Sequence, residues 1–150
     1  MTTAQFDIFL SYARKDVYYA EQLERELQAR GLTVWRDIRG IDPAQDFTAE
    51  IENAIKASKV IVVCVTPDVE RENSFVRRDI SYSQYHQKTI YTVRYEEVPP
   101  PINIFNTSWF DVHKDANAHA RLCAVLNGEE APPTAPTRAK VPNDPFRESL

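Results

Sequence analysis

Short apolar, β-branched segments alternate with segments of helical periodicity along most of the chain. The strand-like segments lie at residues 6–10, 32–35, 60–65, 89–93 and 109–112. The central one, VIVVCV, is apolar throughout, which is typical of a parallel strand buried on both faces of a sheet. After the first strand, one helical face is formed by Val17, Ala20, Leu23 and Leu27. This alternation predicts repeated βα units that build a parallel sheet.

Capping residues predict the ends of the helices and complete the expected architecture. Asp16 and Ser74 precede helical segments, and their side chains can accept hydrogen bonds from the first helical amides. Gly31 follows the first helical segment, where glycine commonly ends a helix. With right-handed crossovers, the pattern predicts an α/β, flavodoxin-like three-layer sandwich, with a five-stranded parallel sheet and helices on both of its faces. Ligands of such sheets bind beyond the carboxyl ends of the strands.

The length and composition limit the number of domains and the classes of partner. The chain has 150 residues, of which 43% are apolar, enough for one domain with a substantial core. From Glu129 onward it is rich in proline and lacks apolar periodicity, so we expect one domain over residues 1–128 and a linker or tail over 129–150. The net charge of −4 argues against nucleic-acid binding. No apolar run approaches the roughly 18 residues of a membrane span, so we expect no membrane association.

Several kinds of chemical site are disfavoured by the residues present. The chain has three glycines, too few for a glycine-rich phosphate loop. Its three histidines are scattered, so we expect no metal site. Cys64 and Cys123 lack CxxC spacing and lie in apolar patterns, which predicts buried free thiols. The N-terminal segment MTTAQFD lacks the features of a secretion signal, and we expect a cytoplasmic protein.

An aspartate in the segment FVRRD lacks the usual helical support. A basic residue three or four positions away normally stabilises a carboxylate inside a helix. Around Asp79 those positions hold Phe75, Val76, Tyr82 and Ser83. Asp79 is therefore a candidate functional carboxylate, although a capping role or a bond to a distant residue would also explain it.

Four segments in register resemble a Toll/interleukin receptor (TIR) domain, especially of the bacterial type. They are FDIFLSYARKD, RGLTVWRDIRGIDPAQDF, EIENAIKASKVIVVCVTPD and SFVRRDISYS. The resemblance implies the flavodoxin-like fold and one of two main roles. The first is cleavage of NAD+ at the nicotinamide–ribose bond on self-assembly, with NAD+ as substrate and no cofactor. The second is an interaction module that binds other TIR domains as a homo-oligomer or filament. A nucleotide-binding sensor without turnover is a third interpretation.

The resemblance assigns the catalytic role to Asp79. Enzymes of the family use a glutamate on the third helix, often four residues after a tryptophan. Here Phe75 stands at the tryptophan position and Asp79 at that of the glutamate. A carboxylate there stabilises the oxocarbenium-like charge that develops on ribose. The side chain of aspartate is shorter than that of glutamate by one methylene, about 1.5 Å. Glu70 or Glu72, in the preceding loop, are alternative candidates for the catalytic carboxylate.

Further substrate-binding candidates come from the same resemblance. Arg14 matches a position suited to bidentate pairing with a pyrophosphate, or it bonds loop carbonyls and Asp16 instead. Trp35 and Phe47 could contact the nucleotide or belong to the core. The complete expected set is Tyr12, Arg14, Trp35, Asp37, Phe47 and Phe75.

The loop over residues 36–46 is the candidate assembly segment. It places Ile38, Ile41 and Pro43 among opposed charges, a composition suited to insertion into another copy. Head-to-tail contacts of this kind propagate into filaments unless they close. A loop folded back on its own surface is the alternative.

Overall fold

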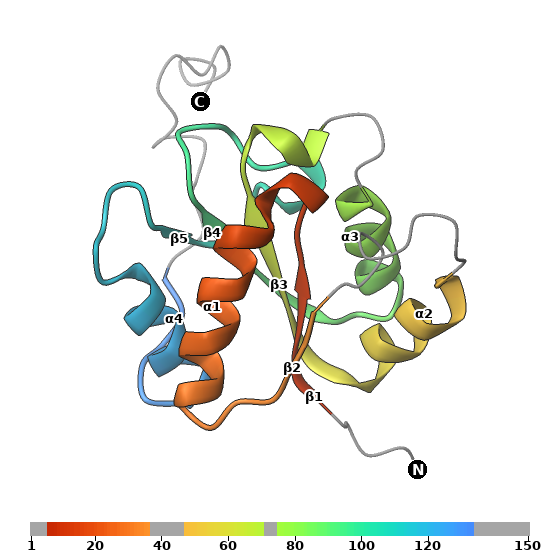
Figure 1. Cartoon of the computed structure of the whole chain (residues 1–150), viewed down its shortest axis with the longest axis horizontal. Helices are drawn as coiled ribbons and strands as arrows, with labels where there is room; N and C mark the ends of the chain where they lie inside the picture. The colour runs from red at the N-terminus through yellow and green to blue at the C-terminus, as the bar shows by residue number, and fades with distance from the viewer. Residues whose placement is uncertain (1–5, 37–46, 71–74, 134–150) are drawn as a thin grey trace, which may run out of the picture.

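Five parallel strands form a single sheet at the centre of the molecule (Figure 1). The computed structural model describes residues 6–36, 47–70 and 75–133. The strands run in the order β2-β1-β3-β4-β5. Their bounds are Phe6–Ser11 for β1, Val34–Arg36 for β2, Ser58–Val65 for β3, Thr89–Arg94 for β4 and Ser108–Asp111 for β5. The predicted flavodoxin-like architecture is confirmed.

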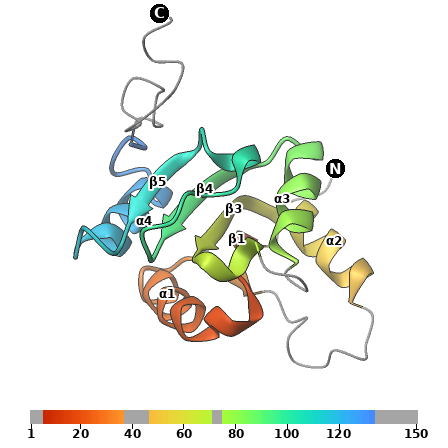
Figure 2. The same cartoon turned by 90° about the horizontal axis from the view of Figure 1, so that it is seen from above.

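Helices cover both faces of the sheet, and those of the described residues lie two on each side (Figure 2). Helices α1 (Val17–Ala29) and α4 (Ala118–Leu126) pack on one face. Helices α2 (Thr48–Ala57) and α3 (Val76–Tyr85) pack on the other. Short 3-10 turns lie at Arg14–Asp16, Pro67–Glu70 and Ile102–Ile104. None of the helices in the described ranges is long and apolar enough to cross a membrane.

The two apolar cores follow the alternation of side chains along the central strands. In β3, Val62 and Cys64 belong to the core beneath α1 and α4. Ile61, Val63 and Val65 belong to the core beneath α2 and α3. The strand is thus buried on both faces, as its unbroken apolar run predicts. Cys64 and Cys123 are buried and free, which confirms the expectation for both.

Helix α1 ends just before Gly31, as the sequence predicts. Because of the turn after this helix, the second strand begins later in the sequence than expected. Gly31 adopts a φ of 83°, a left-handed conformation that glycine accepts without strain. The amide of Leu32 bonds back to Leu27, so the expected strand over residues 32–35 begins only at Val34. Thr33 instead bonds the amides of Asp7 and Ile8 through its carbonyl oxygen.

The capping prediction for Asp16 is wrong, and the third helix begins later than its predicted cap implies. Asp16 occupies the N-cap position of α1 but forms no side-chain cap, because its carboxylate accepts a hydrogen bond from the Thr66 hydroxyl. Ser74 lies outside the described residues. The described helix α3 begins at Val76 with Phe75 at the N-cap position, which places Asp79 in the first turn.

Candidate functional site

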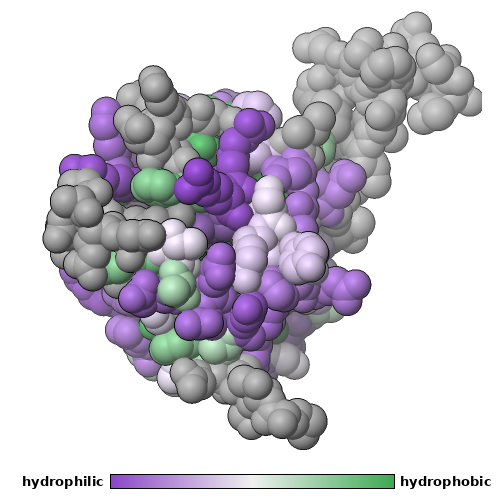
Figure 3. All heavy atoms as spheres, turned by 90° about the vertical axis from the view of Figure 1, so that its right-hand side faces the viewer, coloured by the Kyte–Doolittle hydropathy of each residue, from purple (hydrophilic) through white to green (hydrophobic). Residues whose placement is uncertain are grey.

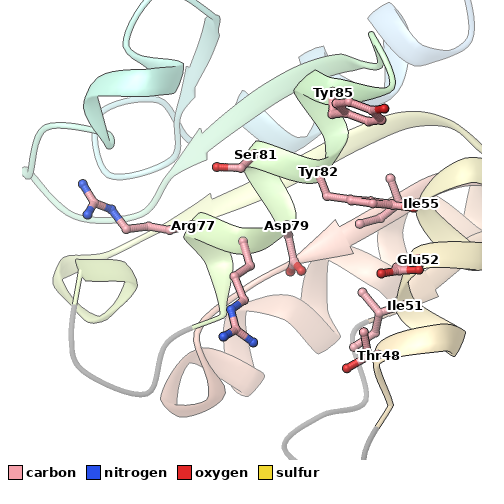
Figure 4. A pocket seen from close by; sticks show the side chains of 10 residues that line it. Thr48, Ile51, Glu52, Ile55, Arg77, Asp79, Ser81, Tyr82 and Tyr85 are labelled. Atoms are coloured by element: carbon pink, nitrogen blue, oxygen red, sulfur yellow. The ribbon is translucent and has the colours of Figure 1, made fainter.

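A pocket of about 520 Å³ lies between helices α2 and α3 (Figure 4). Its walls are mainly apolar, with Ile51 and Ile55 from α2 and Tyr82 and Tyr85 from α3. Asp79 also lines it. Figure 3 shows this side of the molecule, where small apolar areas lie among hydrophilic side chains. The size is typical of a pocket for a small molecule.

Helix α3 directs Asp79 inward because Asp79 shares the buried face of the helix. Val76, Ile80 and Ser83 are buried on the same side, at the three- and four-residue spacing of one helical stripe. The sequence already shows this stripe. It explains why no basic residue stands three or four positions from Asp79. The carboxylate faces the sheet, so its partner comes from a strand.

That partner is Ser11 at the carboxyl end of β1. The Ser11 hydroxyl donates a hydrogen bond of 2.7 Å to Oδ2 of Asp79. The exposed fractions of the two residues are 0% and 1%. A buried carboxylate needs such a donor, and a bond to a charged acceptor is stronger than one between neutral groups. The backbone of Asp79 is fixed as well, because the Ser83 hydroxyl donates to its carbonyl oxygen at 2.5 Å.

Sequence reasoning missed Ser11 as a member of the site. The signal available was the period-two pattern of β1, which places Ser11 on the same face as Phe9. A serine that follows Phe9 on a buried face requires a polar partner, and here the partner is 68 residues away.

The opposite wall of the pocket has a second carboxylate. Glu52 lies on α2, is half-buried and lines the pocket. In Figure 4 the side chains of Glu52 and Asp79 both lie in the space between the two helices. Glu52 was not among the residues expected from the sequence, because it resembles any solvated glutamate of an amphipathic helix.

Two aromatic candidates pack on the same side of the sheet as the pocket. Trp35 stacks on Phe9 with ring centroids 5.1 Å apart, and Phe47 packs against the same core cluster. Phe75 precedes α3 and is 39% exposed. The nucleotide-binding roles of Trp35, Phe47 and Phe75 stay predictions.

Tyr12 and Arg14 lie apart from this pocket. Tyr12 packs against the core cluster beneath α1 and α4, and its hydroxyl accepts a hydrogen bond of 3.1 Å from Arg36. Arg14 is exposed in the turn after β1. Neither residue lines the pocket between α2 and α3. Their expected contacts with a nucleotide stay predictions.

A buried acidic group lies beyond the carboxyl end of β1, where the fold commonly binds ligands. Burial, together with nearby Asp68 and Glu96, raises the pKa of Asp16 to about 6, although the hydrogen bond from Thr66 opposes the shift. The Thr66 hydroxyl in turn accepts the amide of Asp68 at 3.1 Å. The hydrogen bond between Thr66 and Asp16 therefore connects the end of β3 to the start of α1.

Comparison with known families identifies the fold and the family. The sequence profile of the TIR domain matches residues 8–124. The chain belongs to the TIR domain family.

Solved structures of TIR domains share the architecture of this TIR domain at low sequence identity. The TIR domain of the Toll-related receptor TRR-2 from Hydra magnipapillata superposes with a TM-score of 0.66 at 20% identity, over 82% of this chain and 99% of that one. The TIR domains of the activated Roq1 resistosome, which recognises the pathogen effector XopQ, give a TM-score of 0.53 at 16% identity, over 82% and 84%. Comparison with curated protein sequences finds no significant match.

Several residues that the sequence analysis proposed for substrate binding, assembly or catalysis lie outside the residues that the structure describes. These are Asp37 and the assembly residues Ile38, Ile41 and Pro43, together with the alternative carboxylate Glu72. The side chain of Glu70 is likewise not described. Their assigned roles stay predictions.

Proposed function

We propose that this TIR domain cleaves NAD+ at the nicotinamide–ribose bond when copies of it assemble, with Asp79 as the catalytic carboxylate. The observation that supports this proposal best is a buried, hydrogen-bonded carboxylate at the wall of a pocket of about 520 Å³. The proposed reaction is that of the enzymes within the TIR family, and the proposed residue is Asp79 because of its position on the third helix.

Asp79 acts on the charge of the transition state. As the bond between ribose and nicotinamide breaks, its electron pair leaves with nicotinamide and positive charge develops on the ribose. A fixed, buried carboxylate stabilises that charge more than it stabilises the substrate. The Ser11 hydroxyl holds Oδ2 in place, so little reorganisation is needed during the reaction. Nicotinamide departs neutral, and a water molecule adds to ribose with loss of a proton.

The other walls of the pocket suit the remaining parts of the substrate. Ile51, Ile55 and Tyr82 offer apolar surface for a flat ring. Arg78, which also lines the pocket from the first turns of α3, supplies positive charge for the pyrophosphate. Arg14, the residue expected from the sequence for this task, lies in the turn after β1 and would need a ligand that extends beyond the pocket.

Self-assembly is the second part of the proposal. TIR domains generally interact with other TIR domains, and one structural neighbour comes from an activated resistosome. The apolar residues Ile38, Ile41 and Pro43 of the segment between β2 and α2 are the proposed contacts with a second copy.

The decisive experiment measures nicotinamide release across a series of concentrations of the full chain. Asp79→Asn keeps an acceptor for Ser11 but removes the charge, and we expect a loss of about a hundredfold or more in rate. Asp115→Asn, in the segment before α4, is the matched control and should retain wild-type turnover. Intact NAD+ in the wild type at all concentrations would exclude the enzyme.

An interaction module without catalysis is the second candidate. The observation that favours it is the 1% exposure of Asp79, whose side chain is one methylene shorter than the glutamate of the family's enzymes. In this case self-association would respond to changes at Ile38, Ile41 and Pro43, and Asp79→Asn would leave it unchanged. Sedimentation of these variants separates the two candidates.

A further inference from the structure

The pocket between α2 and α3 is lined by one carboxylate from each helix. Among the described residues, Asp79 on α3 and Glu52 on α2 are the acidic side chains that line it (Figure 4). Their environments differ: Asp79 is buried and held by Ser11, whereas Glu52 is only half-buried.

Helix geometry places Glu52 toward the pocket. The α2 residues that line the pocket are Thr48, Ile51, Glu52 and Ile55, which follow the spacing of a single helical face. Glu50, two residues earlier, is exposed and does not line it. The orientation of Glu52 is therefore set by the same turns that bury Ile51 and Ile55 in the core.

The carboxylate of Glu52 is available to a ligand. Within the described ranges it forms no hydrogen bond or ion pair. Its neighbours on the helical face, Ile51 and Ile55, are apolar and buried. A carboxylate that lines an apolar pocket in this way gains most from a polar group that a ligand or a bound water brings.

We propose that Glu52 is a second catalytic carboxylate, which orients the attacking water and accepts its proton. This inference rests on the proposed cleavage of NAD+. Reactions that pass through an oxocarbenium-like state commonly use two carboxylates on opposite sides of the sugar, with different tasks. Here Asp79 stabilises the charge on ribose, and Glu52 activates the nucleophile.

The step is balanced without a further acid. The bond between ribose C1′ and the nicotinamide nitrogen breaks, and its electron pair neutralises the pyridinium, so the leaving group needs no proton. Water oxygen forms the new bond to C1′, and its proton passes to Glu52 and then to solvent. The products are nicotinamide, ADP-ribose and one proton.

The test compares Glu52→Gln with Glu50→Gln, a change of the same kind on the same helix outside the pocket. Each full-length protein is assayed with NAD+ in the presence and absence of an added pyridine base, which competes with water for the ribose. We expect Glu52→Gln to lower ADP-ribose formation by about a hundredfold, the usual range for loss of a general base. Exchange with the pyridine base should fall far less, because that nucleophile has no proton to lose. Glu50→Gln should match the wild type.

The product ratio separates this role from a structural one. A variant that is merely misfolded loses hydrolysis and base exchange together, and its thermal unfolding midpoint falls. Glu52→Asp, which keeps the charge at shorter reach, should recover part of the hydrolysis. An active wild type with an unchanged product ratio in Glu52→Gln would overturn the role of Glu52 alone. An inactive wild type would overturn the proposed function, and the role of Glu52 with it.

Discussion

The bond between Ser11 and Asp79 joins the first strand to the third helix through two buried side chains. Each group needs the other, because neither can reach solvent. Removal of one partner takes a hydrogen bond from a buried polar group, which is more damaging than replacing both groups by apolar ones.

Ser11→Ala is expected to lower the free energy of unfolding by about 1–3 kcal/mol, because the buried Asp79 carboxylate loses the hydrogen bond from Ser11. Ser81→Ala, which removes an exposed hydroxyl from α3, is the matched control and should change stability by less than about 0.5 kcal/mol. Urea denaturation measures both. The double variant Ser11→Ala/Asp79→Ala should lose less than the sum of the two single changes, and strict additivity would contradict the coupling.

Asp16 gives the protein a defined pH dependence. Its pKa is raised from 3.8 to about 6 in the folded state, chiefly by burial, so ionisation opposes folding. Its contribution is fully favourable below about pH 4 and is lost as the pH rises through 6. Asp16→Asn, which cannot ionise and keeps an acceptor for Thr66, should therefore gain stability relative to the wild type between pH 4 and pH 7. Urea denaturation of both proteins at pH 4 and pH 7 measures this gain. The same difference in the free energy of unfolding at both pH values would refute the prediction.

Strands β4 and β5 are joined by an ion pair as well as by their backbone ladder. Arg94 donates to both carboxylate oxygens of Asp111, at 2.5 and 3.0 Å. Its guanidinium also lies 4.9 Å from the ring centroid of Trp109. Arg94 is 8% exposed, so this pair is largely shielded from water. It fixes the edge strand β5, which is only four residues long.

Asp111→Ala is expected to destabilise the fold by about 2–3 kcal/mol, since it leaves a shielded guanidinium without its counter-ion. Glu97→Ala breaks the exposed pair with Lys114, at 3.6 Å, and should cost less than about 1 kcal/mol. Thermal or urea unfolding of the two variants provides the comparison. Equal losses would show that shielding does not govern the strength of these pairs.

The arrangement of the whole domain separates the pocket from the second layer of helices. The pocket lies on the α2 and α3 side, whereas α1 and α4 form a different core on the far face of the sheet. The segment over residues 36–46 connects β2 to α2 and so leads directly to the wall that has Glu52.

Ile41→Asp is expected to reduce self-association and, with it, NAD+ cleavage per molecule at high protein concentration. An aspartate opposes burial of the loop against a second copy. Analytical ultracentrifugation measures association, and nicotinamide release measures activity. The unfolding midpoint should stay near that of the wild type. Wild-type turnover in a strictly monomeric Ile41→Asp variant would disprove the link between assembly and catalysis.

Hydrophobic periodicity was sufficient to predict the layers of this TIR domain, because each strand and helix shows its buried face in its own residues. The unbroken apolar run of β3 predicted a central strand. The stripe of Val17, Ala20, Leu23 and Leu27 predicted a covering helix, in which all but the 40% exposed Val17 are buried. The order of these elements and the family motifs located Asp79 on the third helix. All of this information is local in the chain.

Contacts between distant segments required the folded structure. The bond between Ser11 and Asp79, the position of Glu52 opposite Asp79, and the packing of Tyr12 on the other face of the sheet depend on strand order and on how α2 and α3 pack together. A pattern in the sequence says which face of an element is buried, but it does not say which residue of another element meets it. For this protein, the strands and the candidate carboxylate follow from local patterns, whereas the hydrogen-bonding partner of that carboxylate and the second acid of the pocket follow from packing across the sheet.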